Sequence, residues 1–285
     1  MVPDEVIGIV GSVGKNDMVL ADSITRPDIP GMRVPNKAKA DVSAAFISDI
    51  HIGSKTFLPE QWEKFTKWLK SCEDGAEKVK YLVISGDMVD GVGVFPGQEN
   101  ELLIQDIHEQ YQEFAGKLAE IPDHIRVIIL PGNHETFATV EFLAKQYAPG
   151  VYNLHGRSIL LYDEIGIFGC GSANIGLFEM GDKEVKSTLK KAFEPIKGAK
   201  RKILITHAPP YGTKLDALWA HVGSKGVRDI IEETKPDLCL CGHIHETFGM
   251  HQKVGRTEVI NVGPKGVIVN IQKKTDNSEN KLTLN

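Results

Sequence analysis

The chain has 285 residues, 41% of them apolar and 25% charged, which suits one large α/β domain or two small ones. Its net charge of −5 excludes a protein held on DNA mainly by overall positive charge. The four cysteines form no Cys-x-x-Cys pair, so a reducing, cytoplasmic setting is expected rather than a disulfide scaffold. No apolar run approaches the roughly 18 residues of a membrane span, so no membrane partner is expected.

The first 40 residues are predicted to form a separate element. Residues 6–10 and 18–21 are apolar, and they flank a turn-type tetrapeptide at 14–17, a pattern typical of a β-hairpin. Residues 27–40 are rich in proline and basic residues and are expected to be a linker. The predicted organisation is an N-terminal β-hairpin and linker over 1–40, a main domain over 41–273 and a flexible tail over 274–285.

The rest of the chain alternates between apolar strands and helical stretches. Because the strands are near-continuously apolar, we expect them to be buried on both faces of an α/β sandwich. The glycine- and valine-rich stretch 255–272 is expected to supply closing strands. Strands are predicted at 44–47, 81–84, 127–130, 203–205 and 238–240, and helices near 59–71, 101–120, 137–147, 183–197 and 224–234.

Each of the five predicted strands ends in residues that can hold a metal ion. One such residue alone is commonly a solvated loop residue, but five motifs in order favour a common site, because ligands of α/β sheets bind beyond the carboxyl ends of the strands. Nitrogen and oxygen donors without thiolate suit Mn, Fe or Zn. Seven candidates are too many for one centre, so two ions are predicted. The candidates are Asp49, His51, Asp87, Asn133, His207, His243 and His245.

The order Asp-x-His, Gly-Asp-x-x-Asp, Gly-Asn-His-Glu, a single His and Gly-His-x-His resembles the calcineurin-like metallophosphoesterase family over about residues 43–270. The resemblance implies a four-layer α/β/β/α sandwich with two divalent metal ions, of which Mn is favoured over Fe or Zn. It also implies the arrangement of the ligands. One ion would be held by Asp49, His51 and His245, the other by Asn133, His207 and His243, with Asp87 bridging the two.

The same resemblance implies a mechanism in which a metal-bound hydroxide attacks the phosphorus atom. His134 is not a ligand in the family pattern but faces the substrate phosphate, where it can stabilise charge or protonate the leaving oxygen. Asp90 and Glu135 complete the second and third motifs and are expected to orient the ligands. His134 and Asp87 are therefore the predicted catalytic residues.

The two halves of the chain resemble different phosphoesterases. Residues 47–57 and 86–99 resemble the small subunit of archaeal family D DNA polymerase, a 3′–5′ exonuclease. The hairpin resembles a remnant of the oligonucleotide-binding (OB) barrel that precedes the catalytic domain in that family. Residues 168–174, 206–216 and 242–246 resemble small stand-alone archaeal phosphoesterases.

Three functions therefore stay open. The first is a 3′–5′ exonuclease-type activity on DNA 3′ ends, in a chain that partners a polymerase large subunit. The second is a stand-alone phosphatase or phosphodiesterase acting on a small molecule. The third is a non-catalytic polymerase scaffold, which the complete ligand set disfavours. The basic stretch 183–202 is interpreted as a solvated helix face rather than a nucleic-acid contact.

Overall fold

The computed structural model describes residues 8–13, 19–25, 42–71, 75–92, 101–147, 150–271 and 282–284. The chain divides into two compact units, Met1–Arg33 and Val34–Asn285, and each is described by itself. In the first unit, β1 (Gly8–Val13) and β2 (Val19–Thr25) pair as an antiparallel hairpin, as predicted. The expected linker over 27–40 and Cys72 lie outside the described residues.

The larger unit contains two six-stranded sheets, and the first has the order β14-β13-β3-β4-β5-β6. Strands β3 to β6 are parallel, whereas β13 runs antiparallel to β3, and β14 antiparallel to β13. Strand β14 lies within the stretch for which the sequence predicted a flexible tail. The bounds are β3 (Val42–Ile47), β4 (Val79–Ser85), β5 (Arg126–Leu130), β6 (Val151–Asn153), β13 (Val267–Ile271) and β14 (Leu282–Leu284).

The second sheet has the order β11-β12-β10-β9-β8-β7, with antiparallel strands at both edges and four parallel strands between them. A Cβ atom placed on Gly169 in β8 would lie 3.2 Å from a methyl group of Leu130 in β5, so the two sheets pack closely face to face. The bounds are β7 (Arg157–Leu161), β8 (Ile165–Cys170), β9 (Arg201–Thr206), β10 (Leu238–Cys241), β11 (His251–Val254) and β12 (Thr257–Asn261).

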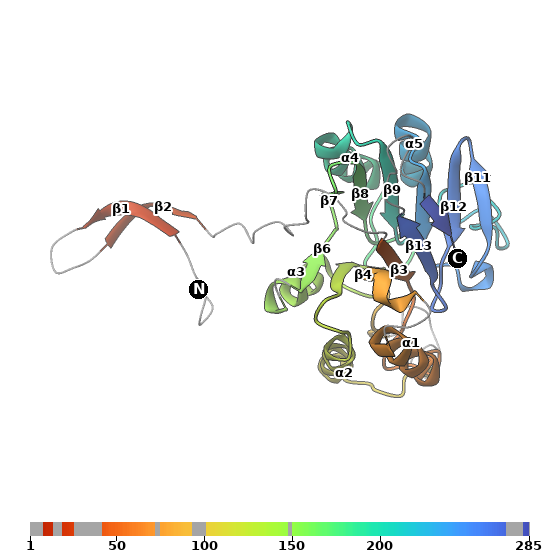
Figure 1. The fold of residues 1–285 in the computed structure, drawn as a ribbon, viewed down its shortest axis with the longest axis horizontal. Helices are drawn as coiled ribbons and strands as arrows, with labels where there is room; N and C mark the ends of the chain where they lie inside the picture. The colour runs from red at the N-terminus through yellow and green to blue at the C-terminus, as the bar shows by residue number, and fades with distance from the viewer. Residues whose placement is uncertain are drawn as a thin grey trace. The chain divides into compact units, whose positions relative to one another are not determined.

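Helices cover the outer face of each sheet (Figure 1), which completes the predicted four-layer α/β/β/α sandwich. Trp62, Leu69 and Phe114 are buried in one core with side chains of β3, β4 and β5, while Leu189 and Ile230 are buried in another with those of β8, β9 and β10. The helices are α1 (Pro59–Ser71), α2 (Ile107–Ala119) and α3 (Phe137–Gln146) on the first sheet, and α4 (Asp182–Phe193) and α5 (Lys225–Thr234) on the second.

Two sequence predictions need adjustment. Helix α2 begins six residues later than the predicted 101, because the Asp106 side chain accepts hydrogen bonds from the backbone N–H groups of His108 and Glu109 and so caps the helix there. Strands β6, β7, β8 and β11 were not predicted. Three of these, β6, β7 and β11, lie at sheet edges, and an edge strand such as Arg157–Leu161 exposes part of its length, unlike the continuously apolar runs that the prediction used.

The basic face of α4 packs beside α5. Lys186 Nζ is 2.6 Å from Asp229 Oδ2 and 2.9 Å from Glu233 Oε1, and Lys190 also pairs with Glu233. These lysines are partly exposed and paired, as expected for a solvated helix face rather than a nucleic-acid contact. Within the described residues, no helix is long and apolar enough to cross a membrane.

Candidate metal centre

Four of the residues that the sequence singled out have a left-handed backbone that residues other than glycine rarely adopt. The φ angles are 54° at Asp49, 53° at His51, 50° at Asp87 and 72° at His243. Each such residue costs of order 1–3 kcal/mol and persists only where its surroundings hold it. The loops hold one another here, since Asp49 N donates to Gly86 O at 3.1 Å and His51 N to Asp87 O at 3.0 Å. Backbone strain is thus concentrated where the predicted ligands lie.

Asp87 lies at the centre of this cluster and is only 1% exposed. Its Oδ2 atom is 3.1 Å from His207 Nε2, 3.7 Å from His51 Nε2 and 3.8 Å from His134 Nε2. Burial opposes ionisation of this carboxyl group, but the imidazoles of His207 and His134 outweigh it and hold the pKa of Asp87 well below its ordinary value. A single carboxylate oxygen is therefore shared by side chains from both sheets, which is the geometry that a bridging ligand requires.

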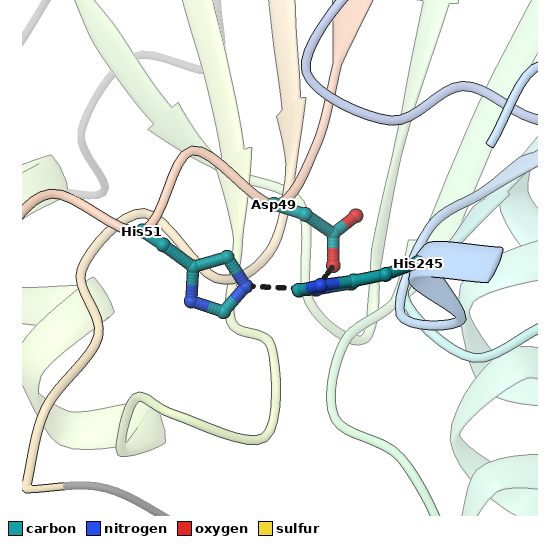
Figure 2. Close-up of side chains that lie close together, drawn as sticks. All are labelled: Asp49, His51 and His245. Atoms are coloured by element: carbon teal, nitrogen blue, oxygen red, sulfur yellow. Dashed lines mark hydrogen bonds and ion pairs between the residues drawn. The ribbon is translucent and has the colours of Figure 1, made fainter. Parts of the chain in front are cut away.

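Asp49, His51 and His245 form the first group of potential ligands (Figure 2), with one donor atom each within 4.8 Å of one another. The Nε2 atoms of His51 and His245 are 3.1 Å apart, and His245 Nε2 is 3.7 Å from Asp49 Oδ1. His51 Nδ1 donates to Asp90 Oδ1 at 2.8 Å, so its Nε2 presents a lone pair to the group. Asp90 thereby sets the tautomer of His51.

Asp87, His207 and His243 form the second group. Asn133 joins them, because its Oδ1 atom is 3.0 Å from His207 Nε2. His207 Nδ1 donates to the Ser85 carbonyl at 2.8 Å, which leaves the Nε2 lone pair directed at two oxygen atoms. Burial opposes protonation of His207, yet the charge of Asp87 raises its pKa to about 9. The pocket therefore attracts positive charge.

These contacts test whether the donors fit metal ions. In the first group two imidazole Nε2 atoms lie 3.1 Å apart, and in the second the Nε2 atom of His207 faces two oxygen acceptors, so each group needs a proton or a cation between its atoms. Metal binding to such a site releases the protons that the imidazoles hold. The donors are nitrogen and oxygen without thiolate, a set that suits Mn, Fe or Zn. The described residues fit two divalent ions.

Two glycines make room for this arrangement. A Cβ atom on Gly132 would collide with the side chain of Asp87, and one on Gly242 would collide with the carboxylate of Asp49. The loops after β5 and β10 can approach the carboxylates only because these positions have no side chain.

Glu135 ties the loop after β4 to the loop after β5. It is 1% exposed, and its carboxylate accepts backbone N–H groups of Asp87 and Val89 at 3.1 Å and of Gly132 at 2.7 Å, as well as that of Met88. Burial and the neighbouring Asp87 raise the pKa of Glu135 to about 7, while the backbone donors oppose this rise.

Replacing Glu135 by alanine should therefore destabilise the protein strongly. Four buried N–H groups would lose their acceptor, and each orphaned donor costs about 1–3 kcal/mol before the loops relax. We expect a loss of about 3–5 kcal/mol in the free energy of unfolding, measured with urea. Glu63→Ala removes a carboxylate whose Lys67 pair is exposed, so it should leave the free energy of unfolding nearly unchanged. Equal stability of the two variants would contradict this role for Glu135.

The cluster opens into a cleft of about 380 Å³ that the predicted ligands Asp87, Asn133 and His243 help to line. His134 also lines it, with Nδ1 held 2.6 Å from the carbonyl oxygen of Asp90. The sequence analysis missed the apolar part of the lining, which includes Ile175, Leu218 and Trp219. A tryptophan in the long loop between His207 and the predicted helix at 224–234 was the available signal.

His155 is not among the described residues that line this cleft. Its ring stacks on Phe137 with centroids 4.3 Å apart, and its Nδ1 atom accepts the backbone N–H of Gly171 at 3.1 Å. Burial, assisted by Arg157, lowers the pKa of His155 to about 4. The folded protein therefore holds this histidine neutral.

This depressed pKa predicts acid sensitivity. When the pH falls below 6.5, the ordinary pKa of histidine, the unfolded chain takes up a proton at His155. The folded chain takes up this proton only near pH 4. The free energy of unfolding should fall across this window, and His155→Gln should reduce the fall. Urea unfolding at several pH values between 4 and 7.5 measures it. His124→Gln, at an exposed loop histidine, is the control and should keep the wild-type profile. Identical profiles for all three proteins would contradict the prediction.

Comparison with known proteins supports the same interpretation. A family model described as calcineurin-like phosphoesterase matches residues 42–247. The DNA polymerase II small subunit of Thermoplasma acidophilum is 34% identical over 264 residues, covering 86% of this chain and 50% of that protein. That of Archaeoglobus fulgidus is 35% identical over 269 residues, covering 86% and 51%. The similarity to these subunits thus extends beyond the first half of the chain. The whole chain spans about half the length of these relatives.

Solved structures are similar in fold. TT1561 of Thermus thermophilus superimposes with a TM-score of 0.58 at 18% identity, covering 86% of this chain and 98% of that one. A phosphopantetheinyl hydrolase from Mycobacterium tuberculosis gives a TM-score of 0.54 at 14% identity, covering 79% and 90%. Together with the family match over residues 42–247 and the clustered metal-binding side chains, these findings lead to one conclusion. The chain belongs to the calcineurin-like phosphoesterase family.

Proposed function

We propose that this chain hydrolyses phosphodiester bonds at a site for two divalent metal ions, with a 3′–5′ exonuclease-type activity on DNA. The observation that carries the proposal is that Asp87 Oδ2 lies within 3.7 Å of an imidazole from each of two groups of potential metal ligands, at 3.7 Å from His51 and 3.1 Å from His207. Relatives named DNA polymerase II small subunit, at 34–35% identity over most of the chain, support DNA as the substrate. They also support a polymerase large subunit as the partner.

The assignment of ligands follows the two groups. Bound metal ions would bind the scissile phosphate and activate a water molecule for in-line attack. The mixed nitrogen and oxygen donors suit Mn, Fe or Zn, and membership of the family favours Mn. In this assignment Asp49, His51 and His245 hold one ion, Asn133, His207 and His243 hold the other, and Asp87 bridges them.

His134 is assigned to the substrate rather than to a metal. Its Nδ1 atom donates to the Asp90 carbonyl, which fixes the ring so that Nε2 is the atom left for the substrate. A proton on Nε2 can stabilise the charge that develops on the phosphoryl oxygens, or pass to the leaving oxygen. Asp90 holds His51 as well, and Glu135 holds the loop of Asp87, so both act by positioning.

Two other functions compete with this one. A stand-alone phosphatase or phosphodiesterase for a small molecule would use the same ligands. A non-catalytic scaffold would keep the fold without needing the ligands. The intact set at Asp49, His51, Asp87, Asn133, His207, His243 and His245 counts against the scaffold.

The deciding experiment compares substrates with one protein preparation. After reconstitution with Mn, the protein should hold close to two ions per chain and shorten 5′-labelled single-stranded DNA from its 3′ end. Bis(4-nitrophenyl) phosphate reports general phosphodiesterase activity. Hydrolysis of that ester without any shortening of DNA would favour the small-molecule enzyme. Bound metal without turnover of either substrate would favour the scaffold.

A further inference from the structure

Trp219 is the most exposed large apolar side chain among the described residues, at 88%. The other two tryptophans, Trp62 and Trp68, pack in or against the core of the first sheet. Trp219 also lines the cleft that contains Asp87 and His134. An aromatic ring left in water at the rim of a site is typical of a surface that binds a ligand.

The loop that carries Trp219 has a well-held backbone. Asp216 is completely buried, and its carboxylate accepts the N–H groups of Thr213 at 2.7 Å and Gly223 at 3.0 Å. It also accepts a hydrogen bond from His221 Nδ1 at 2.9 Å. Since Asp216 binds both ends of the turn, Trp219 is presented from a preorganised tip, which lowers the entropy cost of binding.

The cleft lining around Trp219 suits a flat apolar ring. Leu218 and Ile175 line it too, and their loops are joined by a hydrogen bond from Asn174 Nδ2 to Gly223 O at 3.3 Å. Among the described lining residues there is no lysine or arginine, while Glu101 and Glu246 are present. Beyond the histidines and the proposed metal ions, a second phosphate would meet no cationic side chain in this described lining, so the apolar part favours a base over more of the phosphate backbone.

We propose that Trp219 stacks on the base of the terminal nucleotide of the DNA strand whose phosphodiester bond is cleaved. The proposal rests on the proposed function, because it takes the cleft to bind a DNA end. Stacking on an aromatic ring is insensitive to sequence, since every base has a π-face. Trp219 is then the residue that selects a nucleotide over a simple phosphodiester.

The test crosses enzyme variants with two substrates. The substrates are DNA oligonucleotides identical except that the 3′-terminal nucleotide carries its base or is abasic. Trp219→Ala should lower kcat/KM about tenfold on the base-bearing end, by loss of one stacking contact, and leave the abasic end unchanged. Trp219→Phe should restore most of the loss. Phe142→Ala removes another aromatic side chain, 60% exposed on α3, and should match the wild type on both substrates.

Binding is measured separately from turnover. Fluorescence of the wild type should be quenched more by the base-bearing oligonucleotide than by the abasic one, and Trp219→Phe should lose this difference. Equal losses of kcat/KM on both substrates, or no loss on either, would overturn the stacking role. If the wild type cleaves neither DNA, the proposed function fails. The quenching difference then decides the stacking role alone: its presence supports the role, and its absence overturns it.

Discussion

Replacing Asp87 by asparagine is expected to remove phosphodiesterase activity more completely than any other single conservative change. The substitution keeps the size of the side chain but removes the charge from the oxygen that three imidazoles approach. In the proposed assignment Asp87 bridges the two ions, so both groups should bind ions weakly in this variant. Because loss of one charge-stabilising donor costs about 10²–10³ in rate, loss of the shared ligand should exceed that range. Metal analysis and kcat on bis(4-nitrophenyl) phosphate measure the two effects.

Asp90→Asn is the matched control, because Asp90 contacts His51 rather than a predicted metal position directly. Removing such an orienting carboxylate typically costs about 10- to 100-fold in affinity or activity. The Asp90 variant should therefore retain measurable metal and turnover where the Asp87 variant does not. An Asp87→Asn protein with two bound ions and near-normal kcat would rule out the bridging role.

His134→Ala should lower kcat by about 10²–10³ while both metal ions remain bound. In the proposed assignment His134 is not a ligand, although its Nε2 atom lies 3.8 Å from Asp87 Oδ2, so its loss should remove a group that acts on the transition state and leave both ions in place. KM should change little if the interaction exists only in the transition state. The loss should shrink for nitrophenyl esters if His134 protonates the leaving oxygen, because nitrophenolate leaves without a proton.

Asn133→Ala is the neighbouring comparison. Asn133 Oδ1 belongs to the second metal group through its contact with His207, so this variant should lose activity together with one ion. Metal content, melting temperature and kcat on both variants separate the two roles. A His134→Ala protein with full metal and unchanged kcat would show that His134 has no part in the reaction. A large fall in its melting temperature alone would make it a structural residue of the loop.

Much of the fold was predictable because buried strands and their polar ends are local features of the sequence. The runs ending at Ile47, Ile84 and Leu130 became adjacent parallel strands with the predicted ligands just beyond them. The division of the strands between two sheets depends on pairing between distant segments, which no local pattern carries. Trp219 was missed for a related reason. Tryptophan is usually buried, and only the tertiary structure places this one at a cleft rim.

Because the candidate ligands come from both sheets, the site cannot form until most of the chain has been synthesised. Asp49, His51, Asp87 and Asn133 follow strands of the first sheet, while the three remaining histidines follow strands of the second. The first group therefore joins partners 194 residues apart, His51 and His245, and the ribosome must release nearly the whole domain before they can meet. A nascent or half-folded chain holds only fragments of each coordination sphere. A complete metal site therefore forms only after both sheets have assembled.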